Sequence, residues 1–178
     1  MDLEKIFNIA NKSEQEVAEL CSDLVQINSA HPDGYTAEGA EYITEYLNSH
    51  GNASEVHAKA EKKHDRITQV KGNSSKTILW VGHMDVVPEG KPENWTYPPF
   101  SGKIADSCVW GRGSSDMKGS CAAAIVSARI LNKMEEIPHD VEFWFTSDEE
   151  IGGGAGAKWL AESGRFRGDV CIIGDGNG

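Results

Sequence analysis

The feature of this sequence that most constrains its fold is a set of short apolar runs, each followed within a few residues by histidine or acidic residues. The runs are residues 77–81, 141–146 and 169–173. Continuous apolar runs of this length are typical of strands that are covered on both faces of a sheet. Segments with helical spacing of apolar residues lie between and before them. This alternation predicts an α/β fold, a three-layer sandwich around a mostly parallel mixed sheet.

Several further elements can be predicted from local patterns. Ser13 and Glu16 form a capping-box pattern, which indicates that a helix begins there. A second helix is expected to end just before Gly51, where a left-handed cap suits glycine. The segment rich in proline and aromatic residues is predicted to be an irregular but packed loop. The expected helices are 13–28, 36–50, 118–134 and 157–162, the additional strands 54–59 and 66–71, and the loop 89–107.

Charge and composition exclude some classes of partner. The chain has 17 Lys and Arg against 28 Asp and Glu, a formal net charge of −11, which opposes binding to nucleic acid or to anionic lipid surfaces. No apolar run has membrane-spanning length, and the first residues do not resemble a secretory signal. The sequence therefore predicts one cytoplasmic domain with no nucleic-acid or membrane partner.

The four cysteines and five of the histidines are predicted to have no part in a functional site. The cysteines are far apart and form no Cys-x-x-Cys pair, so buried free thiols are expected, in keeping with a reducing compartment. Five histidines have no neighbouring ligand pattern and are expected at the surface. The cysteines are Cys21, Cys108, Cys121 and Cys171, and these histidines are His31, His50, His57, His64 and His139.

The polar residues that follow the apolar runs are candidate metal ligands. Carboxyl ends of parallel strands meet at one edge of a sheet, and several carboxylates cannot all ionise there at short range unless a cation is present. A lone histidine after a strand is more often structural, and a Glu-Glu pair is usually a solvated turn, so the argument rests on their clustering. Nitrogen and oxygen ligands without thiolates suit zinc, cobalt or manganese. The candidates are His83, Asp85, Glu149, Glu150 and Asp175 at strand ends, with Asp116 before a helix.

Four blocks of the sequence, 82–88, 95–102, 109–119 and 146–150, resemble the co-catalytic zinc metallopeptidases. That family includes acetylornithine deacetylase, succinyl-diaminopimelate desuccinylase, glutamate carboxypeptidase, aminoacylase and carnosinase. The resemblance implies two divalent metal ions, zinc in the first place, with cobalt or manganese as alternatives. It implies a small N-acyl amino acid or dipeptide as the substrate, with the choice left open by Asp175, where deacetylases and desuccinylases often carry glutamate.

The resemblance also assigns roles to individual residues. His83 and Asp175 would bind one metal, Glu150 the other, and Asp116 would bridge both. Glu149 would be the general base. In addition, Asp85 would hold His83 in the tautomer and orientation that metal binding needs, and the peptide bond between Asp116 and Met117 would be cis.

By the same resemblance, residues 1–178 correspond to the N-terminal part of an incomplete catalytic domain. The lid or dimerisation domain and the C-terminal part of the catalytic domain would be absent, and a full-length form would be a homodimer. The alternative is a non-catalytic or truncated relative that binds metal without turnover. An intact Glu149 favours catalysis, because a binding module has no need of a base beside its metal ligands.

Overall fold

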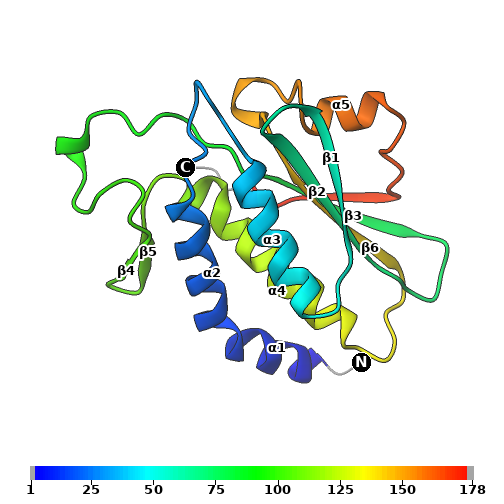
Figure 1. The fold of residues 1–178 in the computed structure, drawn as a ribbon. Coiled ribbons are helices and arrows are strands. Elements are labelled where there is room, and N and C mark those ends of the chain that lie inside the picture. The colour runs from blue at the N-terminus through cyan, green and yellow to red at the C-terminus, as the bar shows by residue number, and fades with distance from the viewer. Residues whose placement is uncertain (1–2, 176–178) are drawn as a thin grey trace.

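The computed structural model describes residues 3–175 and contains a five-stranded mixed sheet in the order β1-β2-β6-β3-β7 (Figure 1). The strands of this sheet are β1 Ser54–Ala60, β2 Lys63–Val70, β3 Thr77–His83, β6 Asp140–Thr146 and β7 Val170–Ile173, and a separate hairpin is formed by β4 Lys103–Ala105 and β5 Cys108–Trp110. The α-helices are α1 Leu3–Lys12, α2 Glu14–Gln26, α3 Ala37–Ser49, α4 Gly119–Asn132 and α5 Ala157–Glu162, with short turns η1 Pro92–Asn94, η2 Ser114–Lys118 and η3 Glu149–Ile151.

The register of the sheet places its polar strand ends together. Strand β3 is parallel to both β6 and β7, whereas β1 and β2 are antiparallel. His83 pairs with Thr146 across β3 and β6, and Val81 pairs with Ile173 across β3 and β7. The carboxyl ends of the three parallel strands therefore lie at one edge, as the sequence predicted. The α/β class and the mixed sheet are confirmed.

The two faces of the sheet are covered unequally. Helices α2, α3 and α4 lie on one face, and α5 lies on the other (Figure 1). The main core fills the space under α2, α3 and α4, with Phe145, Ile43 and Ile125 fully buried. On the α5 face the core cluster consists of Leu79, Trp144 and Leu160. The three layers are present, but one of the outer layers is thin.

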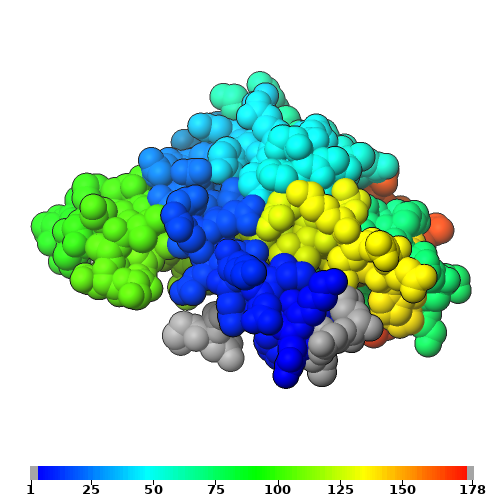
Figure 2. Space-filling view, turned by 90° about the horizontal axis from the view of Figure 1, so that it is seen from below, coloured from blue at the N-terminus to red at the C-terminus, as the bar shows by residue number. Residues whose placement is uncertain are grey.

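The segment between β3 and α4 projects from one side of the molecule, where Figure 2 shows it in green. Its aromatic residues contact one another and the backbone, as expected for a packed loop. The rings of Tyr97 and Trp110 lie 5.6 Å apart, and Trp95 Nε1 donates a hydrogen bond to the carbonyl of Glu89. The β4-β5 hairpin within this segment was not predicted, because its strands are only three residues long.

The helix predicted to begin at Ser13 is present as α2, with Ser13 at its N-cap, but the capping-box hydrogen bonds are not formed. Helix α1 ends at Lys12, directly before α2, so the Ser13 hydroxyl donates to the carbonyl of Ile9 in the preceding turn. Glu16 accepts hydrogen bonds from Tyr46 and Arg129 instead of reaching back to the helix start. An upstream helix and partners distant in the sequence therefore provide the hydrogen bonds that the local capping pattern would have supplied.

The prediction for the cysteines is half wrong. All four are free thiols, but Cys108 and Cys171 are exposed, whereas Cys21 and Cys121 are buried. Both exposed thiols lie on short strands with little covering them, β5 and the edge strand β7. None of the helices in the described part of the chain combines the length and the apolar character needed to cross a lipid bilayer.

Candidate metal centre

The candidate centre lies where β3 and β6 end side by side. His83 is the last residue of β3, and η3 with its two glutamates begins three residues after the end of β6. The backbone N–H of Met84 donates to the Thr146 carbonyl at 2.8 Å, and the Thr146 hydroxyl donates to the Gly82 carbonyl at 3.1 Å. These two bonds lock the strand ends together, so the residues that follow each strand leave from fixed positions.

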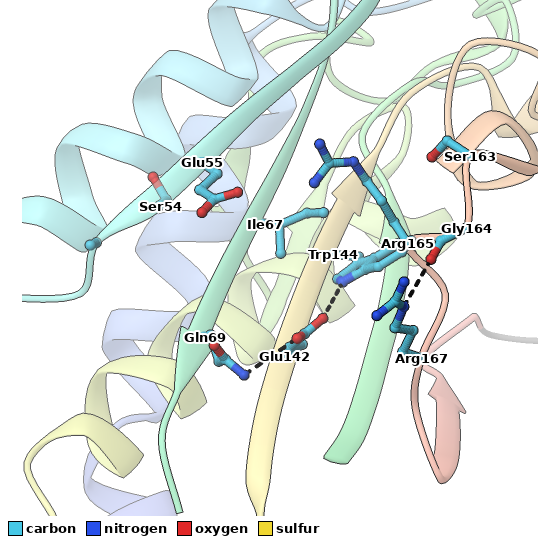
Figure 3. Close-up of a pocket in the computed structure, with 11 residues that line it drawn as sticks. Ser54, Glu55, Ile67, Gln69, Glu142, Trp144, Ser163, Gly164, Arg165 and Arg167 are labelled. Atoms are coloured by element: carbon cyan, nitrogen blue, oxygen red, sulfur yellow. Dashed lines mark hydrogen bonds between the residues drawn. The ribbon is translucent and has the colours of Figure 1, made fainter. Parts of the chain in front are cut away.

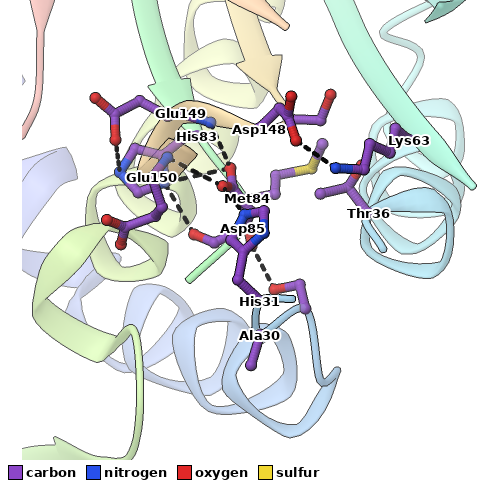
Figure 4. Close-up of polar contacts among 12 residues, drawn as sticks. Ala30, His31, Thr36, Lys63, His83, Met84, Asp85, Asp148, Glu149 and Glu150 are labelled. Atoms are coloured by element: carbon purple, nitrogen blue, oxygen red, sulfur yellow. Dashed lines mark hydrogen bonds and ion pairs between the residues drawn. The ribbon is translucent and has the colours of Figure 1, made fainter. Parts of the chain in front are cut away.

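Three of the predicted ligands form one group. One ligand atom each of His83, Asp116 and Glu150 lies within 4.8 Å of the other two. His83 Nε2 is 3.1 Å from Asp116 Oδ1. The same nitrogen is 3.7 Å from Glu149 Oε2 (Figure 4). With Asp85, which contacts His83 and the backbone of both glutamates, the structure brings together five of the six site residues named from the sequence.

His83 is oriented by the backbone of Asp85. The Nδ1 atom lies 2.9 Å from the Asp85 carbonyl oxygen, whereas the nearest oxygen of the Asp85 carboxylate is 3.7 Å away. A carbonyl can only accept, so Nδ1 carries a proton, and Nε2 is the ring nitrogen available to a metal. This is the tautomer that metal binding through Nε2 requires.

The Asp85 carboxylate is fully buried and has other partners. Its Oδ1 accepts from the backbone N–H of Glu149 at 3.1 Å, and its Oδ2 accepts from the N–H of Glu150 at 3.2 Å. Oδ2 also lies 2.8 Å from His31 Nε2. The carboxylate therefore secures the turn that carries both glutamates.

His31 corrects the expectation that it lies at the surface. Only 7% of the residue is exposed, because its loop folds against the end of β3. The other four histidines in this class are partly exposed. The polar sequence around His31 gave no sign of a partner 54 residues away.

Asp116 reaches the centre from η2. The peptide bond between Asp116 and Met117 is cis, as the resemblance implied. The Asp116 side chain is about half exposed at the centre, while the next residue, Met117, is buried in the core. Gly113 has a φ of +84°, and a Cβ there would lie 2.4 Å from a methyl carbon of Val86, so this approach to η2 requires glycine.

Asp175 lies outside the group. It is exposed, two residues beyond the last residue of β7, and its carboxylate is not among the ligand atoms that converge with His83. The preceding residue is tied to the helix face, since the Ser120 hydroxyl at the start of α4 donates to the Gly174 carbonyl. The pairing of Ile173 with Val81 puts Asp175 at the same sheet edge as His83.

Comparison with known proteins now gives the family. Residues 79–178, which include all six predicted site residues, match the model of peptidase family M20/M25/M40. The chain belongs to this family. The succinyl-diaminopimelate desuccinylase of Wigglesworthia glossinidia brevipalpis is 35% identical over 166 residues, which cover 91% of this chain and 43% of that protein. The chain thus spans less than half the length of this curated relative.

Solved structures agree on the fold of this M20/M25/M40 member. A dipeptidase from Saccharomyces cerevisiae superposes with a TM-score of 0.80 at 20% identity, covering 97% of this chain and 40% of the dipeptidase. YxeP of Bacillus subtilis, described as a dinuclear metal-binding peptidase of the M20 family, superposes with a TM-score of 0.65 at 23% identity, covering 92% of this chain and 42% of YxeP.

The donor set of this candidate centre fits a divalent cation. Imidazole nitrogen and carboxylate oxygens converge, and no lysine or arginine among residues 3–175 forms an ion pair with Asp116, Glu149 or Glu150. Burial raises the pKa of Glu150, and the charge of Asp116 raises it further, against a smaller opposing effect of His83. A bound cation would relieve this repulsion.

A second acidic layer lies behind the centre and was not identified from the sequence. Asp65 on β2 is fully buried and accepts from the N–H and the hydroxyl of Ser147 at 2.7 and 2.9 Å. Burial raises the pKa of Asp65 to about 7, although both hydrogen bonds lower it. Lys63 forms an ion pair with Asp148. Both interactions hold the segment between β6 and η3.

One large hollow is remote from these groups. A cavity of about 630 Å³ opens on the α5 face of the sheet, lined by residues that include Trp144, Glu142, Arg165 and Arg167 (Figure 3). It contains none of the predicted site residues. We therefore place the candidate site by its chemistry, at the sheet edge, and not by the size of the hollow.

Proposed function

We propose that this chain carries the metal-binding part of a hydrolase that cleaves an amide bond in a small N-acyl amino acid or a dipeptide. The observation that supports this proposal most directly is the convergence of His83, Asp116 and Glu150, with Glu149 beside them. The family supports the reaction class. The name of the Wigglesworthia relative points to an N-succinyl amino acid, and the yeast neighbour is called a dipeptidase.

We assign the residues to two divalent metal ions, zinc in the first place, with cobalt or manganese as alternatives. His83 and Asp175 would hold the first, Glu150 the second, and Asp116 would bridge them. The description of YxeP as dinuclear supports the number. When bound, such ions supply Lewis acidity, which lowers the pKa of a water molecule and polarises a carbonyl group.

Glu149 is the proposed general base. Its side chain is about half exposed, and Oε2 lies 3.7 Å from His83 Nε2, so it borders the ligand group without being enclosed by it. From this position the carboxylate would take a proton from the attacking water and deliver it to the leaving nitrogen. Glu149 and Glu150 can divide the work because their carboxylates point in different directions from η3 (Figure 4).

The rival hypothesis is a relative that binds metal without turnover. To separate the two, metal content and hydrolysis are measured on the same preparation, with a panel of N-succinyl and N-acetyl amino acids and dipeptides. The proposal expects hydrolysis that is lost on chelation and restored by zinc, cobalt or manganese. Stoichiometric metal without hydrolysis of any panel member, in a form that spans the full length of the relatives, would favour the rival.

A further inference from the structure

A buried imidazole stands directly behind the metal centre. His31 Nε2 is 2.8 Å from Asp85 Oδ2, and Figure 4 shows the ring on the side of Asp85 away from Glu149. We infer that His31 is a positioning residue, which fixes the Glu149–Glu150 turn through the Asp85 carboxylate. This inference rests on the proposed function, because it gives His31 a part in holding that same site.

The hydrogen-bonding pattern of His31 assigns its proton. Because the Asp85 carboxylate only accepts, the Nε2 atom of His31 must carry the hydrogen. The other ring nitrogen, Nδ1, is buried and has no hydrogen-bond partner among the described residues. The ring therefore offers a single donor, and that donor is directed at Asp85.

The backbone holds the ring firmly in this place. The His31 N–H donates to the Val86 carbonyl at 3.0 Å, the Val86 N–H donates to the Ser29 carbonyl at 3.2 Å, and the Ser29 hydroxyl donates to the Met84 carbonyl at 2.6 Å. A Cβ at Gly34 would lie 2.4 Å from the ring carbon Cε1, so glycine allows the loop to close over the imidazole. The segment around His31 thus runs beside the end of β3 in a fixed register.

The contacts of Asp85 show what His31 controls. The carboxylate accepts two backbone bonds from the turn, at 3.1 Å from Glu149 and 3.2 Å from Glu150, and the His31 contact is the shortest of the three. Oδ2 is shared between His31 and the Glu150 N–H. Without the imidazole donor, Oδ2 would keep only its longer bond, and the carboxylate plane that orients both glutamates would be free to turn.

The test uses the full chain, zinc alone as the ligand, and three variants. His31→Leu removes the donor, His31→Gln keeps an N–H donor, and His139→Leu makes the same change near the start of β6, at the end of the strand remote from the centre. NMR follows the backbone amide signals of Glu149 and Glu150 in metal-free protein, and calorimetry measures zinc affinity.

We expect His31→Leu to shift both amide signals and to lower zinc affinity by about 10-fold, within the range known for groups that support metal ligands. His31→Gln should keep most of the wild-type amide signal positions and zinc affinity. His139→Leu should change neither the amide signals nor the zinc affinity. Unshifted amides with wild-type zinc affinity in His31→Leu would overturn the inference, as would a His31→Gln variant as impaired as His31→Leu.

The wild-type protein supplies a measurement that does not depend on any variant folding. Its NMR spectrum should contain a slowly exchanging Nε2–H signal from His31, and a proton found on Nδ1 instead would overturn the inference. If wild-type protein binds no zinc at all, the proposed function fails, while the amide shifts and the His31 proton still decide the role of His31.

Discussion

The face of the sheet covered by α2, α3 and α4 and the face covered by α5 differ in how they support the candidate centre. On the face covered by α2, α3 and α4, the Cys121 thiol donates to the His83 carbonyl at 3.2 Å, and the Ser29 hydroxyl donates to the Met84 carbonyl. These two hydrogen bonds hold the end of β3 in place. On the other face, the small core leaves a cavity of about 630 Å³. The residues of edge strand β7 are exposed, with Val170 at 55% and Ile173 at 67%.

The difference explains which predicted ligands the structure assembles. His83 ends β3, a strand with neighbours on both sides and a full core on one face, and it lies close to Asp116 and Glu150. Asp175 follows β7, which in this structure has one neighbouring strand, and its carboxylate stays outside the group. The candidate ligands at the well-packed strand ends therefore converge, whereas the candidate beyond the exposed edge strand does not.

The largest expected effect is on metal binding. Titration of metal-free protein with zinc should find one tight site, and His83→Ala should remove it, a greater loss than the roughly 10–100-fold that follows removal of a supporting group. Asp175→Ala should weaken zinc less, because this carboxylate is exposed and outside the group. Two equally tight sites, or tight binding that survives His83→Ala, would contradict the comparison.

The stability of the two faces should differ as well. Phe145 is fully buried under the helices, so Phe145→Ala should lower the free energy of unfolding by about 3–5 kcal/mol. Ile173 is 67% exposed on β7 and pairs with Val81 of the α5 face, so Ile173→Ala should cost roughly 1 kcal/mol or less. Urea unfolding of metal-free protein measures both. Similar losses for the two variants would show that the α5 face is packed more fully than its contacts indicate.

The proposed general base should affect turnover and not metal. In an active form of the protein, Glu149→Ala should lower kcat by at least about 100-fold, the scale of general acid–base catalysis. Metal content should stay unchanged, since Glu149 borders the ligand group. Loss of metal instead would mean that Glu149 and Glu150 exchange roles, and near-normal turnover would remove Glu149 from the mechanism.

A further expected effect is a pH dependence of stability caused by Asp65. Its pKa is raised from 3.8 to about 7 in the folded protein, so between these values the folded state holds a proton that the unfolded state has lost. This contribution to stability is present below about pH 4 and is lost as the pH rises towards and through 7. The stability of wild type relative to Asp65→Asn, from urea unfolding at several pH values, should therefore fall from pH 4 to pH 7. A flat difference would contradict the assignment.

Much of the fold could be predicted because its signals are local. The helix predicted at 157–162 matches α5, and the runs at 77–81 and 141–146 lie within β3 and β6. The run at 169–173 forms β7, but this strand is exposed and is not covered on both faces, contrary to the prediction. Gly51, expected as a left-handed cap, has a φ of +82°. Helix α1 was missed, and so was its effect on Ser13, because a capping pattern cannot reveal what precedes it.

The sequence by itself determined the ligand chemistry, because histidine and carboxylates stand at the ends of strands whose periodicity is visible in short windows. Only the tertiary structure decided that the Asp85 carbonyl orients His83, that the Asp85 carboxylate holds the glutamate turn, and that His31 supports it from 54 residues away. The physical reason is that a donor and an acceptor become partners through burial at a shared place. Neither residue type nor spacing along the chain specifies that place.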